Sequence, residues 1–324
     1  MNARTTILLV VILVVLGVVA TLTETNRKKQ WKPSGNKLLP EYVAEKVDEL
    51  DLSKGSLRVE LAKQNGSWVV GTENDQPADT ALVSGILDNL NGLTSDDLVS
   101  TNAESHPALE VDSTGVDVVI HAGGDEVGHI IVGKPGPDGM STYVRLAGQD
   151  NVYRVPVYLR SQVDRGDQSW RNKTVLKVPQ AEIASYTTTD ETGSVTLVQD
   201  PPGNWKMTAP QEGPVDPGLV PMLLQTLTNV TARAFADSVT SLAEVGLEPP
   251  QRTIEVVLRS GERHTLLIGS QNPANQNYVK LADSETIYLV PAGRWNTVFR
   301  KPSELLVSQT EGKTAVESSA PAGD

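Results

Sequence analysis

The stretch WVVGTENDQPADTALVSGILDNLNGL, residues 68–93, recurs as WKMTAPQEGPVDPGLVPMLLQTLTNV, residues 205–230. Each copy begins at a tryptophan, passes through a loop to an aspartate, and continues with apolar residues at helical spacing. The loops differ, at residues 72–77 and 209–214, whereas the tryptophan, the aspartate and the apolar spacing are kept. We therefore interpret the repeated element as a folding unit and expect function to lie where the copies differ.

The aspartate of each copy predicts the start of an amphipathic helix. Asp79 and Asp216 are suitable N-caps, because a carboxylate accepts hydrogen bonds from the free N–H groups of the first turn. Pro221 does not fit a helix that begins at Asp216, so the second helix is expected to start late or bend. The apolar residues share a spacing that places them on one buried stripe. They are Leu82, Ile86, Leu90 and Leu93 in the first copy, and Leu219, Leu223, Leu227 and Val230 in the second.

Short strands flank the helix in both copies. Residues 47–52 and 57–61 alternate apolar with polar, and turn-forming residues then lead to Trp68, which predicts a hairpin. After the helix, apolar strands recur in the same order, with connections too short for crossovers, so we expect an antiparallel meander. The matched segments are 116–120, 130–133, 143–146 and 152–156 in the first copy, and 254–258, 266–269, 278–281 and 287–291 in the second.

These patterns predict an α+β protein with an N-terminal transmembrane helix and two tandem repeats. Each repeat is expected to be an antiparallel sheet, β-β-α-β-β-β-β with an extra strand at its start, and one amphipathic helix packed on it. The predicted parts are a transmembrane anchor 1–23, a connector 24–40, repeat 1 at 41–165, a linker 166–180, repeat 2 at 181–305 and a disordered tail 306–324.

Residues 5–22 are uncharged and almost wholly apolar, close to the roughly 20 residues that span a bilayer as a helix. The alternative is a signal peptide cleaved after Ala20. The length of the run and the bulky Val18 favour an uncleaved anchor. Bases cluster after the span, which by the positive-inside rule would place the body in the cytoplasm, yet a lone N-terminal span normally acts as a signal anchor. We expect a single-pass protein of the inner (cytoplasmic) membrane of a bacterium, with its soluble body in the periplasm or otherwise outside the cytoplasm.

The composition excludes some functional classes. The net charge is −12, and the sequence contains no concentrated basic patch, so no nucleic-acid partner is expected. There is no cysteine, which excludes disulfides, thiol catalysis and cysteine-ligated metals. The sequence contains neither a nucleophile elbow nor a paired-histidine metal motif. We therefore predict no catalytic, cofactor-binding or metal-binding residues, no cofactor and no enzymatic activity.

Several segments nevertheless have two interpretations. The glycine-rich loop at residues 133–139 follows a strand, as a phosphate loop does, but another strand comes next, which favours a hairpin turn. The acidic pairs 96–97 and 125–126 could bind calcium, but turn-surface acids are favoured. The remaining candidates are four histidines, for which exposed or strand-edge positions are favoured over a metal site, and two aromatic pairs, for which packing is favoured over a binding groove. They are His106, His121, His129 and His264, with Trp68/Trp205 and Tyr143/Tyr278.

The repeated pattern resembles a bacterial membrane-anchored domain-of-unknown-function family (number four-three-four-zero), here in two tandem copies. The matching features run in order from Trp68 through residues 78–90 to residues 132–133, 143–146 and 152–156. The resemblance covers about residues 40–300 and includes the segment 170–174. It implies a link to ABC-type exporter components of the gliding-motility type, and it supplies no catalytic residues.

Two principal functions are consistent with these observations. The first is a non-enzymatic, membrane-anchored accessory or scaffold protein of the cell envelope, held in the lipid bilayer by residues 5–22 and partnered by an ABC transporter permease or another envelope protein. The second is a binding module for an envelope glycan, peptide or small ligand in a cleft between the repeats. A third alternative, an envelope hydrolase, would require polar residues to converge in a pocket.

Overall fold

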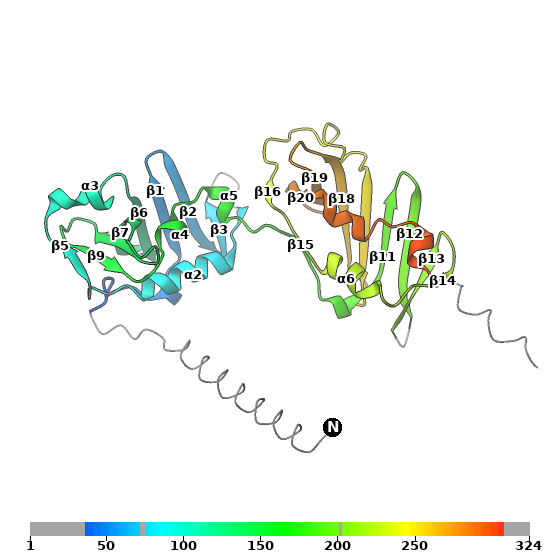
Figure 1. The fold of residues 1–324 in the computed structure, drawn as a ribbon, viewed down its shortest axis with the longest axis horizontal. Helices are drawn as coiled ribbons and strands as arrows, with labels where there is room; N and C mark the ends of the chain where they lie inside the picture. The colour runs from blue at the N-terminus through cyan, green and yellow to red at the C-terminus, as the bar shows by residue number, and fades with distance from the viewer. Residues whose placement is uncertain (1–35, 72–75, 201–202, 308–324) are drawn as a thin grey trace, which may run out of the picture. The chain divides into compact units, whose positions relative to one another are not determined.

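A computed structural model describes residues 36–71, 76–200 and 203–307. The chain divides into two compact units between Arg171 and Asn172, and each is considered separately (Figure 1). The predicted span at residues 5–22 and nearly all of the predicted tail lie outside the described residues. Within the described ranges, no helix is both long and apolar enough to span a membrane.

The first unit is built on one nine-stranded antiparallel sheet in the order β4-β3-β2-β1-β6-β7-β8-β9-β5. The predicted hairpin strands are β1, β2 and β3, and the predicted meander is β6 to β9. The strands are β1 (Glu49–Lys54), β2 (Leu57–Gln64), β3 (Ser67–Gly71), β4 (Gln76–Pro77), β5 (Leu98–Ser100), β6 (Val116–Ala122), β7 (Asp125–Pro135), β8 (Thr142–Leu146) and β9 (Val152–Val155). The helices are η1 (Ala44–Lys46), α2 (Thr80–Asn91), η2 (Ala103–Ser105), α3 (His106–Leu109), α4 (Arg160–Val163) and α5 (Asp167–Trp170).

The pairing of β1 with β6 joins the hairpin and the meander into a single sheet. Leu50 lies beside Ile120 and Leu52 beside Val118, so the apolar residues of both strands share one face. That face is covered by α2, whose buried residues belong to the same core (Figure 1). The short edge strands β4 and β5 and the small helices were not predicted. The predicted α+β repeat is thus found, with more strands than expected.

Helix α2 begins where the sequence predicts. The Asp79 carboxylate accepts hydrogen bonds from the N–H groups of Ala81 and Leu82, which stabilises the first turn. Its buried residues are Val83, Ile86, Leu87 and Leu90, while Leu82 is only partly buried. The buried stripe therefore keeps Ile86 and Leu90 of the prediction and adds Val83 and Leu87, while Leu93 is buried beyond the end of the helix.

The second unit repeats this architecture in the sheet order β14-β13-β12-β11-β17-β18-β19-β20-β16. Its strands are β11 (Ile183–Asp190), β12 (Gly193–Asp200), β13 (Asn204–Ala209), β14 (Gly213–Pro214), β16 (Ala234–Phe235), β17 (Arg252–Leu258), β18 (Arg263–Gln271), β19 (Gln276–Leu281) and β20 (Tyr288–Pro291). A separate two-stranded sheet pairs β10 (Thr174–Lys177) with β15 (Asn229–Thr231). The helices are η3 (Gln180–Glu182), α6 (Val220–Thr228), η4 (Ala292–Thr297) and α7 (Pro302–Leu305).

Helix α6 starts later than its copy in the first unit. Asp216 is not its N-cap, which corrects the prediction: the Asp216 carboxylate accepts from the N–H of Gly218 in the preceding turn, and Leu219 caps the helix. Pro221 then stands in the first turn, where a missing N–H costs nothing. Val230 lies on β15 and not on the helix. The late start predicted from Pro221 is confirmed.

The strand registers refine the alignment of the two repeats. Val118 pairs with Leu52 and Ile130, and Ile254 pairs with Thr188 and Leu266. Val118 and Ile254 are therefore equivalent positions. The sequence-based match of residues 116–120 with residues 254–258 was therefore wrong by two residues, the repeat distance of side chains on one face of a strand. The corrected register makes Asp117 equivalent to Thr253 and His121 equivalent to Val257.

The segment predicted as a linker, residues 166–180, is packed into the units. The carbonyl of Trp170 accepts from the N–H of Asp79, and the carbonyl of Leu305 accepts from the N–H of Asp216 in the same way. Trp170 is fully buried in the first core, and Val175 lies in the second. Packing also reaches into the predicted connector, because Leu38 and Leu39 belong to the first core.

Candidate functional site

A polar pocket of about 940 Å³ lies in the second unit. It lies at one end of the sheet, where β11 and β18 end and β17 and β19 begin. These ends meet because neighbouring strands are antiparallel. Residues of η4 and Phe299 also line the pocket.

Arg252 is the cation of this pocket. Its guanidinium lies 4.9 Å from the centroid of the Phe299 ring and donates to the Asn277 side-chain oxygen at 3.3 Å. Burial lowers the pKa of Arg252, although nearby Asp190 opposes that shift. Stacking on an aromatic ring holds the guanidinium in a fixed plane while leaving further N–H groups for a ligand.

Most of the other polar lining consists of amide side chains, which are Gln251, Gln271, Asn275, Asn277 and Asn296. Asn277 is buried and donates to the carbonyl of Gly269 at 2.9 Å, so its position is set by the strand backbone. Gln271 donates to Asn275 across the hairpin between β18 and β19. An amide offers both donors and an acceptor, which suits hydroxyl and peptide groups of a ligand.

The same end of the first sheet is closed by an ionic network. Arg160 is buried and donates to the carbonyl of Val132 at 3.1 Å. It also pairs with Asp164 at 2.9 Å and with Glu110 at 3.4 Å. Lys54, at the end of β1, reaches Asp164 at 2.6 Å. The equivalent residue at the end of β11 is Asp190, so this position carries the opposite charge in the second unit.

The pKa of Asp164 reflects this network. Burial is the largest influence and would raise it, but hydrogen bonds from Lys54 and Arg160 outweigh burial, and the pKa is lowered. The carboxylate therefore stays ionised and paired. In the first unit this ionic network thus lies at the sheet end where the second unit has its pocket of about 940 Å³.

The glycine-rich loop is a hairpin turn, as favoured from the sequence. It joins β7 to β8, and Asp138 accepts from the hydroxyl of Ser141 and the N–H groups of Ser141 and Met140. These bonds, led by the Ser141 hydroxyl, lower the pKa of Asp138 to about 2. Of the acidic pairs, Asp97 is paired with Arg154 at 2.6 Å, and residues 125–126 begin β7.

Three of the four paired aromatic residues are packing residues, and Tyr278 is partly buried on β19. Trp68 and Trp205 are buried in the two cores, and Tyr143 packs against a small cluster on the other face of the first sheet. Neither tryptophan lines the pocket of the second unit. This confirms the interpretation favoured from the sequence for Trp68, Trp205 and Tyr143.

The histidines occupy several environments. His106 bonds the carbonyl of Asp150, and His264 lies 3.2 Å from Glu262. His121 on β6 and His129 on β7 lie on inner strands of the first sheet, not at its edges. His129 is bonded to Asp117 at 2.5 Å.

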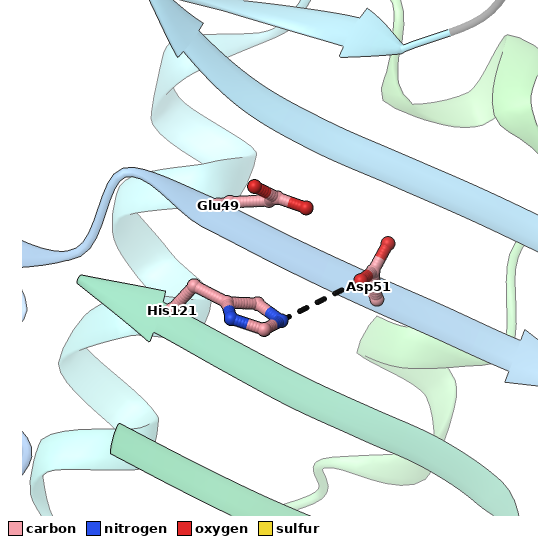
Figure 2. A group of neighbouring side chains, drawn as sticks. All are labelled: Glu49, Asp51 and His121. Atoms are coloured by element: carbon pink, nitrogen blue, oxygen red, sulfur yellow. Dashed lines mark ion pairs between the residues drawn. The ribbon is translucent and has the colours of Figure 1, made fainter. Parts of the chain in front are cut away.

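His121 belongs to a second cluster, on the sheet face opposite α2. Figure 2 shows Glu49 and Asp51 projecting from β1 beside the His121 ring on β6. One ligand atom from each residue lies within 4.8 Å of the others. The His121 Nε2 atom is 3.7 Å from an Asp51 oxygen. All three side chains are partly buried.

Sequence reasoning missed both arrangements. Strand alternation places Glu49 and Asp51 on one polar face, and this signal is present in the sequence. The sequence contains no comparable signal for the pairing of β1 with β6, because a helix and several turns separate these two strands. The pocket likewise depends on strand ends that meet only in the folded sheet.

A family model described as Domain of unknown function (DUF4340) matches residues 68–212 and again residues 205–310. The two matches begin at the two repeated tryptophans, which confirms the resemblance and the tandem duplication. No curated protein matches, and no solved structure matches.

Proposed function

This chain belongs to the DUF4340 family of domains of unknown function, and we propose that it is a non-enzymatic accessory protein that binds a partner through the pocket of its second repeat. The observation that carries this proposal is the difference between equivalent sheet ends. One is occupied by the ion pair of Arg160 with Asp164, and the other is an open pocket of about 940 Å³. Both units keep the same strand order, so the pocket is not required by the fold.

The proposed setting is the bacterial inner membrane. The apolar run at residues 5–22 supports a membrane anchor, and the resemblance supports an ABC-type transporter as partner. The body then lies outside the cytoplasm, where an exporter presents its outer loops. A fusion of alkaline phosphatase to the C-terminus, active only outside the cytoplasm, tests this orientation.

The lining of the pocket supports binding over catalysis. Its amides and its stacked arginine can hold polar groups in place, but an amide side chain does not exchange protons at neutral pH. The two acids at its rim lie near solvent, with Asp190 partly exposed and Glu191 exposed.

Site-specific photo-crosslinking in native membranes tests the partner. A photoreactive residue replaces Gln251, which is exposed at the pocket, and in a matched control replaces Gln64, which is exposed at the end of β2. We expect the Gln251 probe to capture a transporter permease, identified by mass spectrometry, and the Gln64 probe not to. Absence of a permease at Gln251, or equal capture at both sites, contradicts the proposal.

The five amides favour a second candidate function, a binding module for an envelope glycan or peptide. This relocates the predicted ligand site from a cleft between the repeats to one repeat. Titration with neutral glycan and peptide fragments, followed by nuclear magnetic resonance of side-chain amides, distinguishes the two functions. Saturable shifts at Asn277 that are lost in the Arg252→Gln variant support a ligand. Shifts outside the pocket alone argue against it.

A further inference from the structure

We propose that Glu49, Asp51 and His121 bind a divalent transition-metal ion on the open face of the first sheet. Glu49 and Asp51 alternate with buried leucines on β1, so both carboxylates project from one face. His121 is the cross-strand partner of Glu49 on β6. Figure 2 shows the three side chains converging there, and their ligand atoms all lie within 4.8 Å of one another.

The three side chains are available as ligands. The gap of 3.7 Å between His121 Nε2 and Asp51 is too long for a hydrogen bond. In the described part of the chain, the Glu49 carboxylate accepts no hydrogen bond from another residue. On the same face His129 differs, since its Nε2 is bonded to Asp117 at 2.5 Å and its Nδ1 lies 3.8 Å from Glu126. His121 is therefore poised for a further contact, and His129 is already paired.

Electrostatics at this place favours a cation. Glu49 and Asp51 place two carboxylates near each other on one face of β1. Their like charges repel one another, and the partly buried setting screens them less than bulk water would. A bound dication offsets that repulsion and engages the imidazole nitrogen at the same time.

The donor set selects the class of metal. An imidazole with two carboxylates suits Zn²⁺ and Mn²⁺, whereas Ca²⁺ and Mg²⁺ prefer oxygen ligands alone. Three protein ligands on an exposed sheet face leave further coordination positions for water or for a partner group.

The second repeat shows that the fold does not require these residues. In the shared register, Glu49, Asp51 and His121 correspond to Ser185, Thr187 and Val257. Both sheets have the same strand order with either set. The ligand set is thus an addition to one repeat, and it is independent of the pocket in the other.

Calorimetric titration of Zn²⁺ into the full-length protein, purified in detergent and stripped with a chelator, tests the site. We expect one equivalent to bind, and His121→Ala to weaken the affinity by about tenfold or more. The matched control His129→Ala should leave the affinity within about twofold, because that ring is bonded to Asp117. Circular dichroism confirms that each variant is folded. Unchanged Zn²⁺ affinity in His121→Ala, or an equal loss in His129→Ala, overturns the proposal.

A transplant provides the converse test. The triple variant Ser185→Glu, Thr187→Asp, Val257→His recreates the ligand set on the second sheet. A second equivalent of Zn²⁺ supports the geometric argument. A folded variant that still binds only one equivalent shows that strand positions alone do not make this site, and counts against the proposal. Mn²⁺ in place of Zn²⁺, followed by electron paramagnetic resonance of the parent protein and of His121→Ala, gives an independent readout of binding at His121.

Discussion

The two repeats of this protein share a backbone plan and differ in what they place on it. At one end of the first sheet, Arg160 is buried among carbonyls and carboxylates. At the same end of the second sheet, Arg252 lies over Phe299 beside an open, amide-lined pocket. An arginine is present in both. Within the described residues Arg160 forms ion pairs with Asp164 and Glu110, whereas Arg252 forms none within 4.0 Å and Asp190 acts on it from further away.

The outer faces differ in the same manner. The first sheet carries histidines and carboxylates on β1, β6 and β7. The second carries hydroxyls on β11 and β12, with Thr187 bonded to Thr196 and Thr189 bonded to Ser194, and beside them the ion pair of Glu255 with Arg263. In contrast, the two cores are built alike, from apolar residues of the strands and of one helix that packs on the sheet. Duplication has preserved what folding needs and changed what the surface presents.

The largest effect is expected where the repeats agree. Trp68→Ala and Trp205→Ala each remove a buried ring from a core, at a cost of about 3–5 kcal/mol in the free energy of unfolding of the unit concerned. Hydrogen exchange measured separately for amides of each unit reports which one is destabilised. Equal losses confirm that the tryptophan is a shared folding element. A loss of stability in only one of the two variants would show that the tryptophan does not stabilise both repeats equally.

The next effect tests the ionic seal. Arg160→Met removes the cation that Asp164 and Glu110 face, and should destabilise the first unit by about 2–3 kcal/mol. Asn296→Met in the second unit, at the exposed pocket wall, should change stability by less than about 0.5 kcal/mol. Urea unfolding with hydrogen exchange as the probe measures both. Similar losses in the free energy of unfolding for the two variants would contradict the claim that the ion pairs of Arg160 stabilise the first unit at this sheet end.

A smaller effect distinguishes the two aspartates that precede the helices. Asp79→Ala removes a carboxylate that accepts two N–H groups of α2, at a cost of about 1 kcal/mol. Asp216→Ala removes a bond within a turn before α6, and should cost less than about 0.5 kcal/mol. Thermal unfolding of the two variants gives the comparison. A larger loss for Asp216 would contradict the late start of α6.

The smallest effect concerns pH. The pKa of Asp164 is lowered in the folded state, so its contribution is fully present above its unfolded pKa of about 4 and is lost as the pH falls through the folded value. Asp164→Asn should therefore flatten the acid decline in the stability of the first unit, by about 1 kcal/mol or less. Urea unfolding between about pH 3 and pH 7 measures this. An unchanged acid slope would show that Lys54 and Arg160 do not bias this carboxyl.

Much of the architecture was predictable because it rests on local signals. The hairpin from β2 to β3 turns at Asn65 and Gly66, both with positive φ, which asparagine and glycine tolerate better than most residues. Asp79 and Pro221 marked the helix starts for similarly local reasons. Because the same turns and helix starts recur in both copies, each copy supported the interpretation of the other.

The candidate sites were not predictable, because they depend on contacts between distant segments. Arg252, Asn277 and Phe299 carry no motif, and they meet only when β17, β19 and the chain after η4 are assembled. Glu49 and His121 are likewise neighbours only through the pairing of β1 with β6. Strand alternation predicts which face of the sheet a polar residue occupies, but it does not predict which residue of the neighbouring strand lies beside it.

The sequence by itself determined the duplication, the antiparallel hairpins and meanders, and the helix that packs on each sheet, because alternation, caps and turns act within a few residues. Only the tertiary structure decided that one sheet end is sealed and the other open, and that carboxylates on β1 meet a histidine on β6. The physical reason is register. A shift of one residue in the pairing of β1 with β6 would turn Asp51 from the open face toward the core, and strand pairing at long range is set by the packed sheet as a whole.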